Sequence, residues 1–224
     1  MTYELHEAAL KGEVEKVMTL LDQDHDPLQA DEVGRYPIFC ALQLPTYHAT
    51  ALKQQKETIY KKLLPYYDNV SDYHDRSGET IIHYMAKYNY DKLLMGHELK
   101  NDNSTTTLHT ENNVGQKPIH YAIMRKNEAI FERLFQSTED KTSPDRYGQN
   151  LIHHIAHYGT PTMLRTFCNA IGDVSPYIEA KDHNGFTPAQ IAINFNTTSD
   201  VNEIMDILVE HGAKRESRAP SPFS

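Results

Sequence analysis

Apolar residues return every three or four positions in short segments of this chain, and polar turns separate the segments. In one of the clearest, Val14, Val17 and Leu20 share a helical face, with Glu13 opposite. Strands would instead alternate apolar and polar residues. The pattern predicts short amphipathic α-helices near residues 5–11, 14–21, 37–44, 57–64, 81–88, 118–126, 129–135, 151–158, 163–169, 188–195 and 202–211.

A sequence motif also recurs, which consists of a glycine, a helix start, a histidine and then a small residue. One copy reads Gly78-Glu-Thr-Ile-Ile-His83-Tyr-Met-Ala86, and another reads Gly148-Gln-Asn-Leu-Ile-His153-His-Ile-Ala156. The anchor glycines Gly34, Gly78, Gly115, Gly148 and Gly185 are 44, 37, 33 and 37 residues apart. A period near 33 residues is typical of stacked repeat arrays, in which a repeat buries its apolar face only against its neighbours.

The motif resembles the ankyrin repeat, whose pattern is roughly G-x-T-P-L-H-x-A-A followed by a second helix ending in L-L-x-x-G-A. The best local matches are residues 179–188 (EAKDHNGFTP) and 204–213 (IMDILVEHGA). The resemblance implies an all-α fold, an ankyrin-repeat solenoid of about six helix-turn-helix repeats with hairpin loops over residues 1–213. The repeats are expected to start near residues 1, 32, 76, 113, 146 and 183, and residues 214–224 to form a disordered tail.

Histidine occupies the same place in four copies, as His6, His83, His120 and His153. The resemblance implies that each imidazole hydrogen-bonds backbone between repeats. Phe39 and Gln190 stand at this position in two other copies, so altered hydrogen bonding is expected there.

Two segments depart from the repeat. The second repeat has surplus residues between its helices, around 45–55, and the third is followed by a polar stretch at 100–113. We interpret the first as an insertion that extends the following helix, and the second as a long mobile loop on the hairpin side. The second helix of the third repeat is poorly patterned.

The 13 histidines invite a metal or catalytic interpretation. His153 and His157 have the i, i+4 spacing of a zinc pair, but His153 already has a role in the repeat and no third ligand is apparent. Cys40 lies on a core face, which favours a buried hydrophobe over a nucleophile. No phosphate-binding loop, nucleophile elbow or dinucleotide fingerprint occurs. We therefore predict no catalytic residue, no metal ligand and no cofactor.

Net charge and composition restrict the classes of ligand and the cellular location expected for this chain. The net charge of −9 argues against nucleic-acid binding, and no apolar run is long enough for a membrane span. Cys40 and Cys168 lie in different repeats, and the N-terminus lacks an apolar signal region. A cytoplasmic monomer is expected, and delivery into a host cell cytosol remains open.

By the geometry of the family, partners bind to a palm formed by the first helices and to the hairpin tips that flank it. Mapped onto this sequence, the predicted partner-binding residues are Arg76, Lys87, Tyr88, Met124, Arg125, Arg146, Tyr147, His157, Tyr158, Phe186 and Phe195. Tyrosine and arginine are also the residues that dominate interface hot spots.

These features predict a non-catalytic protein-protein interaction module that acts as an adaptor, an inhibitor or a host-directed bacterial effector. The partner is expected to be a protein of unknown identity. The alternative is an enzyme whose site is grafted on the array near the insertions at 45–55 or 100–113.

Overall fold

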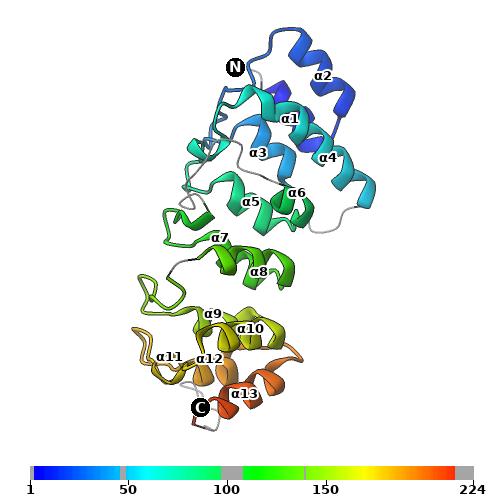
Figure 1. Cartoon of the computed structure of the whole chain (residues 1–224). Helices are drawn as coiled ribbons and strands as arrows, with labels where there is room; N and C mark the ends of the chain where they lie inside the picture. Colours follow the sequence, from blue (N-terminus) through cyan, green and yellow to red (C-terminus); the bar gives the residue numbers. More distant parts are fainter. Residues whose placement is uncertain (1–2, 46–48, 97–107, 139, 215–224) are drawn as a thin grey trace, which may run out of the picture. The chain divides into compact units, whose positions relative to one another are not determined.

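The computed structural model describes residues 3–45, 49–96, 108–138 and 140–214 of the 224-residue chain (Figure 1). The predicted disordered tail falls, apart from Lys214, outside the described residues. The regular elements of this described part are helices, joined by one isolated β-bridge between His74 and Thr80. The chain divides into two units, Met1–Pro118 and Ile119–Ser224, and each is considered by itself.

The first unit contains paired antiparallel helices from three repeats. Its elements are α1 (Glu4–Lys11), α2 (Val14–Asp22), α3 (Pro37–Leu42), α4 (Thr50–Leu63), the 3-10 turns η1 (Leu64–Tyr66) and η2 (Val70–Asp72), α5 (Ile81–Lys87) and α6 (Asp91–Gly96). The first helices α1, α3 and α5 pack side by side, and α2 packs against α4. This arrangement gives the unit the two helical layers of a repeat stack.

The second unit continues the same plan. Its elements are α7 (Pro118–Met124), which begins at the boundary between the units, α8 (Glu128–Ser137), α9 (Leu151–Tyr158), α10 (Pro161–Ile171), α11 (Ser175–Ile178), α12 (Pro188–Phe195) and α13 (Val201–Glu210). Helices α9 and α12 pack together as first helices, and α8, α10 and α13 form the second layer.

The helix predictions are confirmed in position, with corrections at some ends. Helix α4 begins at Thr50 rather than near residue 57, because the insertion adds two turns to its start. Helix α3 ends at Leu42, and Gln43 is extended. Helix α6 is the poorly patterned second helix of the third repeat, for which no range was predicted. Helix α11 was not predicted, because it has only four residues and no clear apolar period.

Each hairpin between repeats is closed by one side-chain oxygen. In the hairpin at residues 75–79, Oδ1 of Asp75 accepts hydrogen bonds from the backbone N–H groups of Ser77 at 2.8 Å and Glu79 at 2.9 Å. Asp31, Asn112, Asp145 and Asp182 do the same in the other four hairpins. Such turns satisfy backbone groups locally and explain why an acid or amide precedes each anchor glycine by three residues.

One part of the predicted mobile loop therefore belongs to an ordered hairpin. Asn112 closes the turn, and Nδ2 of Asn113 donates to the carbonyl of Arg76 at 2.7 Å. Leu108 is buried. The prediction was wrong for residues 108–113 because asparagine here plays the part that aspartate plays in the other hairpins, while residues 100–107 lie outside the described part of the chain.

Two anchor glycines offer a matched test of hairpin stacking. Gly148 and Gly185 both have positive φ, 74° and 83°. A Cβ at Gly148 would lie 2.7 Å from Cδ2 and 3.1 Å from the backbone nitrogen of His183, whereas a Cβ at Gly185 meets nothing within 4 Å. The amide of His183 also donates to the carbonyl of Tyr147 at 2.9 Å, so this close approach joins successive hairpins.

We expect Gly148→Ala to lower the free energy of unfolding by about 2–3 kcal/mol and Gly185→Ala by about 1 kcal/mol. Both changes strain the backbone, at a cost of about 1–2 kcal/mol for an L-residue with positive φ. Only the first also forces the next hairpin to move. Urea denaturation measures the difference, and equal losses would contradict a tight contact between hairpins.

Three of the four repeated histidines, His6, His83 and His153, have the role that the resemblance implied. Nε2 lies 3.0 Å from the carbonyl oxygen of Arg35 in His6, 2.9 Å from that of Gln116 in His83, and 3.2 Å from that of Phe186 in His153. In His83 and His153 the Nδ1 atom accepts the N–H of the residue that starts the helix, so Nε2 carries the proton and donates. Burial lowers the pKa of these imidazoles, which keeps them neutral.

The two copies without histidine differ as expected. Phe39 is fully buried, and its ring meets Tyr84 of the next repeat edge-on at 5.0 Å. Gln190 retains the helix-start contact of the histidine, because its Oε1 accepts the N–H of Thr187 at 3.0 Å.

Candidate functional site

The predicted partner-binding residues fall in both units, and their surroundings are described for each unit by itself. Arg76, Lys87 and Tyr88 belong to the first unit. The second unit carries Met124, Arg125, Arg146, Tyr147, His157, Tyr158, Phe186 and Phe195. Their role in binding stays a prediction, and their surroundings differ sharply between the units.

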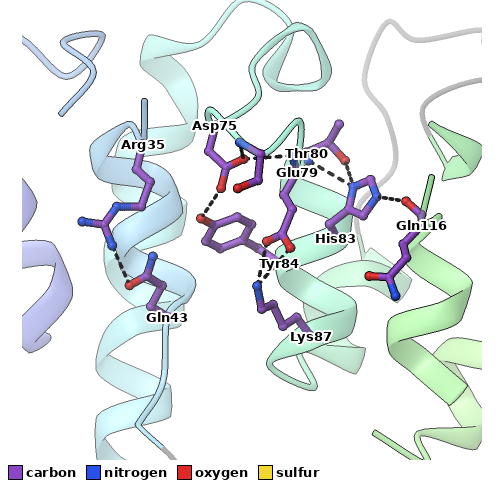
Figure 2. A network of polar contacts seen from close by, with 10 residues as sticks. Arg35, Gln43, Asp75, Glu79, Thr80, His83, Tyr84, Lys87 and Gln116 are labelled. Atoms are coloured by element: carbon purple, nitrogen blue, oxygen red, sulfur yellow. Dashed lines mark hydrogen bonds and ion pairs between the residues drawn. The ribbon is translucent and has the colours of Figure 1, made fainter. Parts of the chain in front are cut away.

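In the first unit, the polar side chains of the palm bind one another (Figure 2). Nζ of Lys87 lies 3.0 and 2.9 Å from the two carboxylate oxygens of Glu79, whose side chain is only 7% exposed. The hydroxyl of Tyr84 donates to Oδ2 of Asp75 at 2.9 Å. Burial, together with the Asp75 carboxylate, raises the pKa of Tyr84, so this hydroxyl remains a donor. The charge of Lys87 is thus already engaged inside the unit.

The neighbouring palm position shows the same behaviour. Nη1 of Arg35 donates to Oε1 of Gln43 at 3.2 Å. Nε of Arg35 donates to Oδ2 of Asp31 at 2.8 Å. Tyr88 is half-buried, with its ring 5.9 Å from that of Tyr84. This surface offers few unengaged groups to a partner, although Arg76 is exposed at its hairpin.

The second-repeat insertion leads to an unusual interior lysine. Lys56 of α4 is fully buried, and its Nζ donates to the carbonyl oxygens of Ala9 and Cys40, each at 3.1 Å. These carbonyls lie near the C-terminal ends of α1 and α3, where helix carbonyls lack intrahelical partners and cations are favoured. Lys56 therefore ties two repeats together. Sequence reasoning missed it, because a lysine within Lys53–Glu57 reads as exposed.

Neither Lys56 nor Cys40 has the setting of an accessible catalytic group. Burial lowers the pKa of Lys56 to about 8 and raises the pKa of Cys40 to about 11. A thiol with a raised pKa is a poor nucleophile at neutral pH. Residues 46–48 of the insertion at 45–55 and residues 100–107 of the segment at 100–113 lie outside the described part of the chain.

In the second unit, aromatic rings gather at the ends of α9 and α12. The ring of His157 stacks on that of Tyr158 with centroids 3.6 Å apart and lies 5.9 Å from that of Phe195, which meets Phe186 edge-on at 5.4 Å. Tyr158 is 40% exposed and Phe195 45% exposed. We call these four residues the aromatic cluster. Burial and the nearby His154 lower the pKa of His157, so its ring stacks in the neutral form.

The position of the cluster follows from local sequence. Tyr158 ends α9 because Gly159 follows, and Phe195 ends α12 because Asn196 turns away with extended backbone. Nδ2 of Asn196 then donates to the carbonyl of Ala156 at 2.8 Å, which holds the two helix ends together. Two large rings are thereby left facing solvent, where single soluble domains seldom keep adjacent apolar side chains without a binding role.

Acidic groups on the adjoining hairpins turn away from solvent. Oδ1 of Asp145 closes its turn and its Oδ2 lies 3.0 Å from Nε2 of His154. Burial would raise the pKa of Asp145, but hydrogen bonds from His154 and from backbone amides outweigh it and lower the pKa to about 2. Asp182 likewise closes its turn, and its Oδ2 accepts Nε2 of Gln149 at 2.9 Å.

Cationic and aromatic side chains at the hairpins and first-helix ends of this unit are exposed. Tyr147 is 54% exposed, and Arg125 and Arg146 are also exposed. Arg125 stands five residues after His120, as Tyr158 stands five after His153. It therefore occupies the matching position at the end of α7.

Metal chemistry finds no support among residues 3–45, 49–96, 108–138 and 140–214, where no three His, Cys, Asp or Glu side chains converge. Both ring nitrogens of His153 are engaged within the fold, which removes half of the i, i+4 pair. None of the helices in the described part has the length and apolar character that spanning a bilayer requires.

Comparisons with known proteins agree with this architecture. The family profile described as "Ankyrin repeats (3 copies)" matches residues 119–219. The human B-cell lymphoma 3 protein is 26% identical over 102 residues, and the rat nuclear factor NF-kappa-B p105 subunit is 25% identical over 177 residues. These alignments cover 46% and 78% of this chain but only 22% and 18% of the two relatives.

Solved structures show the same fold over most of the chain. An ankyrin repeat domain from Acinetobacter baumannii AYE is similar with a TM-score of 0.65 and 19% identity, covering 95% of this chain and 99% of that domain. A chain from the complex of a predatory endopeptidase of Bdellovibrio bacteriovorus with an immunity protein gives 0.66 and 19%, covering 93% and 98%. The ankyrin repeat domain of Bcl-3 gives 0.64 and 14%, covering 95% and 87%.

Proposed function

We propose that this chain, which has the fold of ankyrin repeat domains and matches the ankyrin-repeat profile over residues 119–219, is a non-catalytic module that binds a protein partner, and that the aromatic cluster is the centre of its binding surface. The observation that carries this proposal is the stacked group of His157, Tyr158 and Phe195, held at two packed helix ends with two of its rings exposed. Covering such rings removes apolar area from water, and aromatic anchors of this kind dominate binding free energies.

The contrast between the units supports this location. In the first unit Lys87, Glu79, Arg35 and Gln43 are engaged with one another. A partner would have to break those bonds before gaining any of its own, which reduces the net gain. A partner that covers the aromatic cluster does not have to break such polar contacts.

The relatives suggest the kind of role. Bcl-3 is a member of the IkappaB protein family, and the Bdellovibrio structure pairs an endopeptidase with an immunity protein. Both are consistent with an inhibitor that covers a protein target. An adaptor and a host-directed bacterial effector use the same surface chemistry. We propose a cytoplasmic monomer, with the acidic net charge of −9 disfavouring nucleic acid.

We expect Tyr158→Ala and Phe195→Ala each to weaken partner binding at least tenfold, because each removes a central ring, while the thermal unfolding midpoint stays unchanged. Partners are captured from lysate with the wild-type chain, with each variant and with Tyr66→Ala. Tyr66 is the matched control, an exposed aromatic in η1 outside the palm. Isothermal titration calorimetry with the captured partner gives the affinities.

The proposal requires that wild type and Tyr66→Ala both capture the same partner and that Tyr158→Ala and Phe195→Ala fail to capture it. Retention by all four proteins would place the binding surface elsewhere. Loss only on changing residues of the two insertions would instead favour the grafted-site enzyme.

A further inference from the structure

In the second unit the ends of the first helices carry an exposed cation as well as the aromatic cluster. Arg125 is exposed at the end of α7, and none of the ion pairs found among the described residues includes its guanidinium. Its neighbour Lys126 is different, because Nζ of that residue lies 2.6 Å from Oδ2 of Asp200. Arg125 is thus a cation left available beside a lysine that is already neutralised.

Several carboxylates of this unit are engaged within the fold. The two hairpin carboxylates, Asp145 and Asp182, point into their own turns. In the second-helix layer, Glu203 and Glu210 of α13 face Arg165 of α10 at 3.6 and 3.7 Å. Arg125 and the aromatic rings thus stand at the ends of first helices in a chain whose net charge is −9.

Repeat geometry sets the spacing between the cation and the rings. Arg125, Tyr158 and Phe195 end the first helices of three successive repeats. The rings of His120 and His154, with centroids 4.4 Å apart, connect α7 to α9, and α9 packs on α12. Packed helices lie about 8–10 Å apart, which is the length of about three residues of extended peptide.

We propose that the segment bound by this surface is an acidic peptide with an apolar anchor, in which an Asp or Glu pairs with Arg125 about three residues from a side chain packed on His157, Tyr158 and Phe195. This inference rests on the proposed function and adds the chemistry of the partner. Arginine and carboxylate can form paired, charge-assisted hydrogen bonds, and an aromatic floor accepts a range of apolar anchors. The carboxylate supplies direction and the anchor supplies most of the affinity.

The test is a selection of random 12-residue peptides displayed on phage against the full chain, followed by binding measurements on the enriched peptides made synthetically. We expect Asp or Glu to be enriched two to four residues from Leu, Phe or Trp relative to the unselected library. Arg125→Ala should weaken the binding of these peptides about tenfold. The affinity of wild type for them should fall as the salt concentration rises from 50 to 300 mM.

Charge reversal makes the test specific. A second selection against Arg125→Glu should enrich Lys or Arg at the place where wild type enriches acids. Arg133→Glu is the matched control, an exposed arginine of α8 in the same unit, and its selection should resemble that of wild type. Equal thermal midpoints show that the variants remain folded.

The outcomes separate the two proposals. Peptides that need Tyr158 and Phe195 but show no acidic enrichment, or no exchange on charge reversal, would overturn the acidic peptide and leave the binding surface in place. Peptides indifferent to Tyr158 and Phe195, or no selected peptides at all, would count against both.

Discussion

Replacing Lys56 by alanine is expected to lower the free energy of unfolding by about 3 kcal/mol. Replacing a buried Leu, Ile or Met side chain by alanine costs ~2–5 kcal/mol, and the buried stem of Lys56 is of similar length. Its four-carbon stem is fully buried in α4, and its ammonium binds the carbonyls of Ala9 and Cys40. The variant loses the packing and both cross-repeat hydrogen bonds together. Urea denaturation measures the loss.

Lys56→Met separates the stem from the charge. Methionine retains much of the packing, and each carbonyl keeps a backbone partner, since Gly12 N–H donates to Ala9 and Gln43 N–H donates to Cys40. The cost at neutral pH should therefore be smaller than that of alanine, because a buried charge without a carboxylate is removed at the same time. A methionine variant as unstable as the alanine variant would show that the ammonium itself holds the repeats together.

The pH dependence has a definite sign. Burial lowers the pKa of Lys56 from 10.5 to about 8, so above pH 8 the unfolded chain holds a proton that the folded chain has released. Stability then rises with pH by up to about 1.4 kcal/mol per unit. Between pH 7.5 and pH 9 wild type should gain about 1 kcal/mol relative to Lys56→Met.

The comparison with Lys56→Met is needed because above pH 9 the titration of Cys40 lowers the stability as the pH rises, which is opposite to the effect of Lys56. Burial raises the pKa of its thiol to about 11, so the folded chain keeps a proton that the unfolded chain loses. That effect is largely shared by wild type and Lys56→Met and cancels in their difference. Parallel pH profiles for the two proteins would contradict a depressed pKa at Lys56.

His153→Ala is expected to lower the free energy of unfolding by about 3 kcal/mol. The fully buried imidazole accepts the N–H of Asn150 at 3.1 Å and donates to the carbonyl of Phe186 at 3.2 Å. Its removal leaves a donor and an acceptor without these partners, each at about 1–3 kcal/mol, and creates a cavity. Chemical denaturation provides the measurement.

The chain contains its own control for this prediction. Gln190 stands where the histidine would be and accepts the N–H of Thr187 at the start of α12. His153→Gln should therefore recover the helix start but not the longer reach to Phe186, and should fall between wild type and alanine. A glutamine variant equal to alanine would mean that the cross-repeat bond supplies the whole effect.

Most of the helix layout could be predicted from sequence, because the determinants are local and repeated. Thr187, Pro188 and Asn150 mark helix starts through their own side chains, and each anchor glycine marks a turn. Repetition then supplies the long-range contacts, since every repeat packs on its neighbours in the same way. The histidine bonds were predictable for the same reason, whereas the short helices α6 and α11 lack a repeated signal.

The candidate site was predictable only as a row of positions. The sequence places Lys87, Arg125, Tyr158 and Phe195 at the ends of first helices, but it does not show which of them are engaged. Lys87 meets Glu79 eight residues away, and Arg35 meets Gln43 eight residues away, because a hairpin folds back over a helix. The contact between the hairpin and helix side chains depends on how these two elements are placed relative to each other. It therefore produces no periodic pattern in the sequence.

By itself the sequence determined the repeat, its helices and the capping histidines, since these follow from dihedral preferences and spacing within about 33 residues. Only the tertiary structure decided that Lys56 is interior, that the polar palm of the first unit satisfies itself, and that the rings of α9 and α12 gather with their ends exposed. Burial and pairing are set by side chains from different repeats meeting in space, so no single stretch of sequence specifies them.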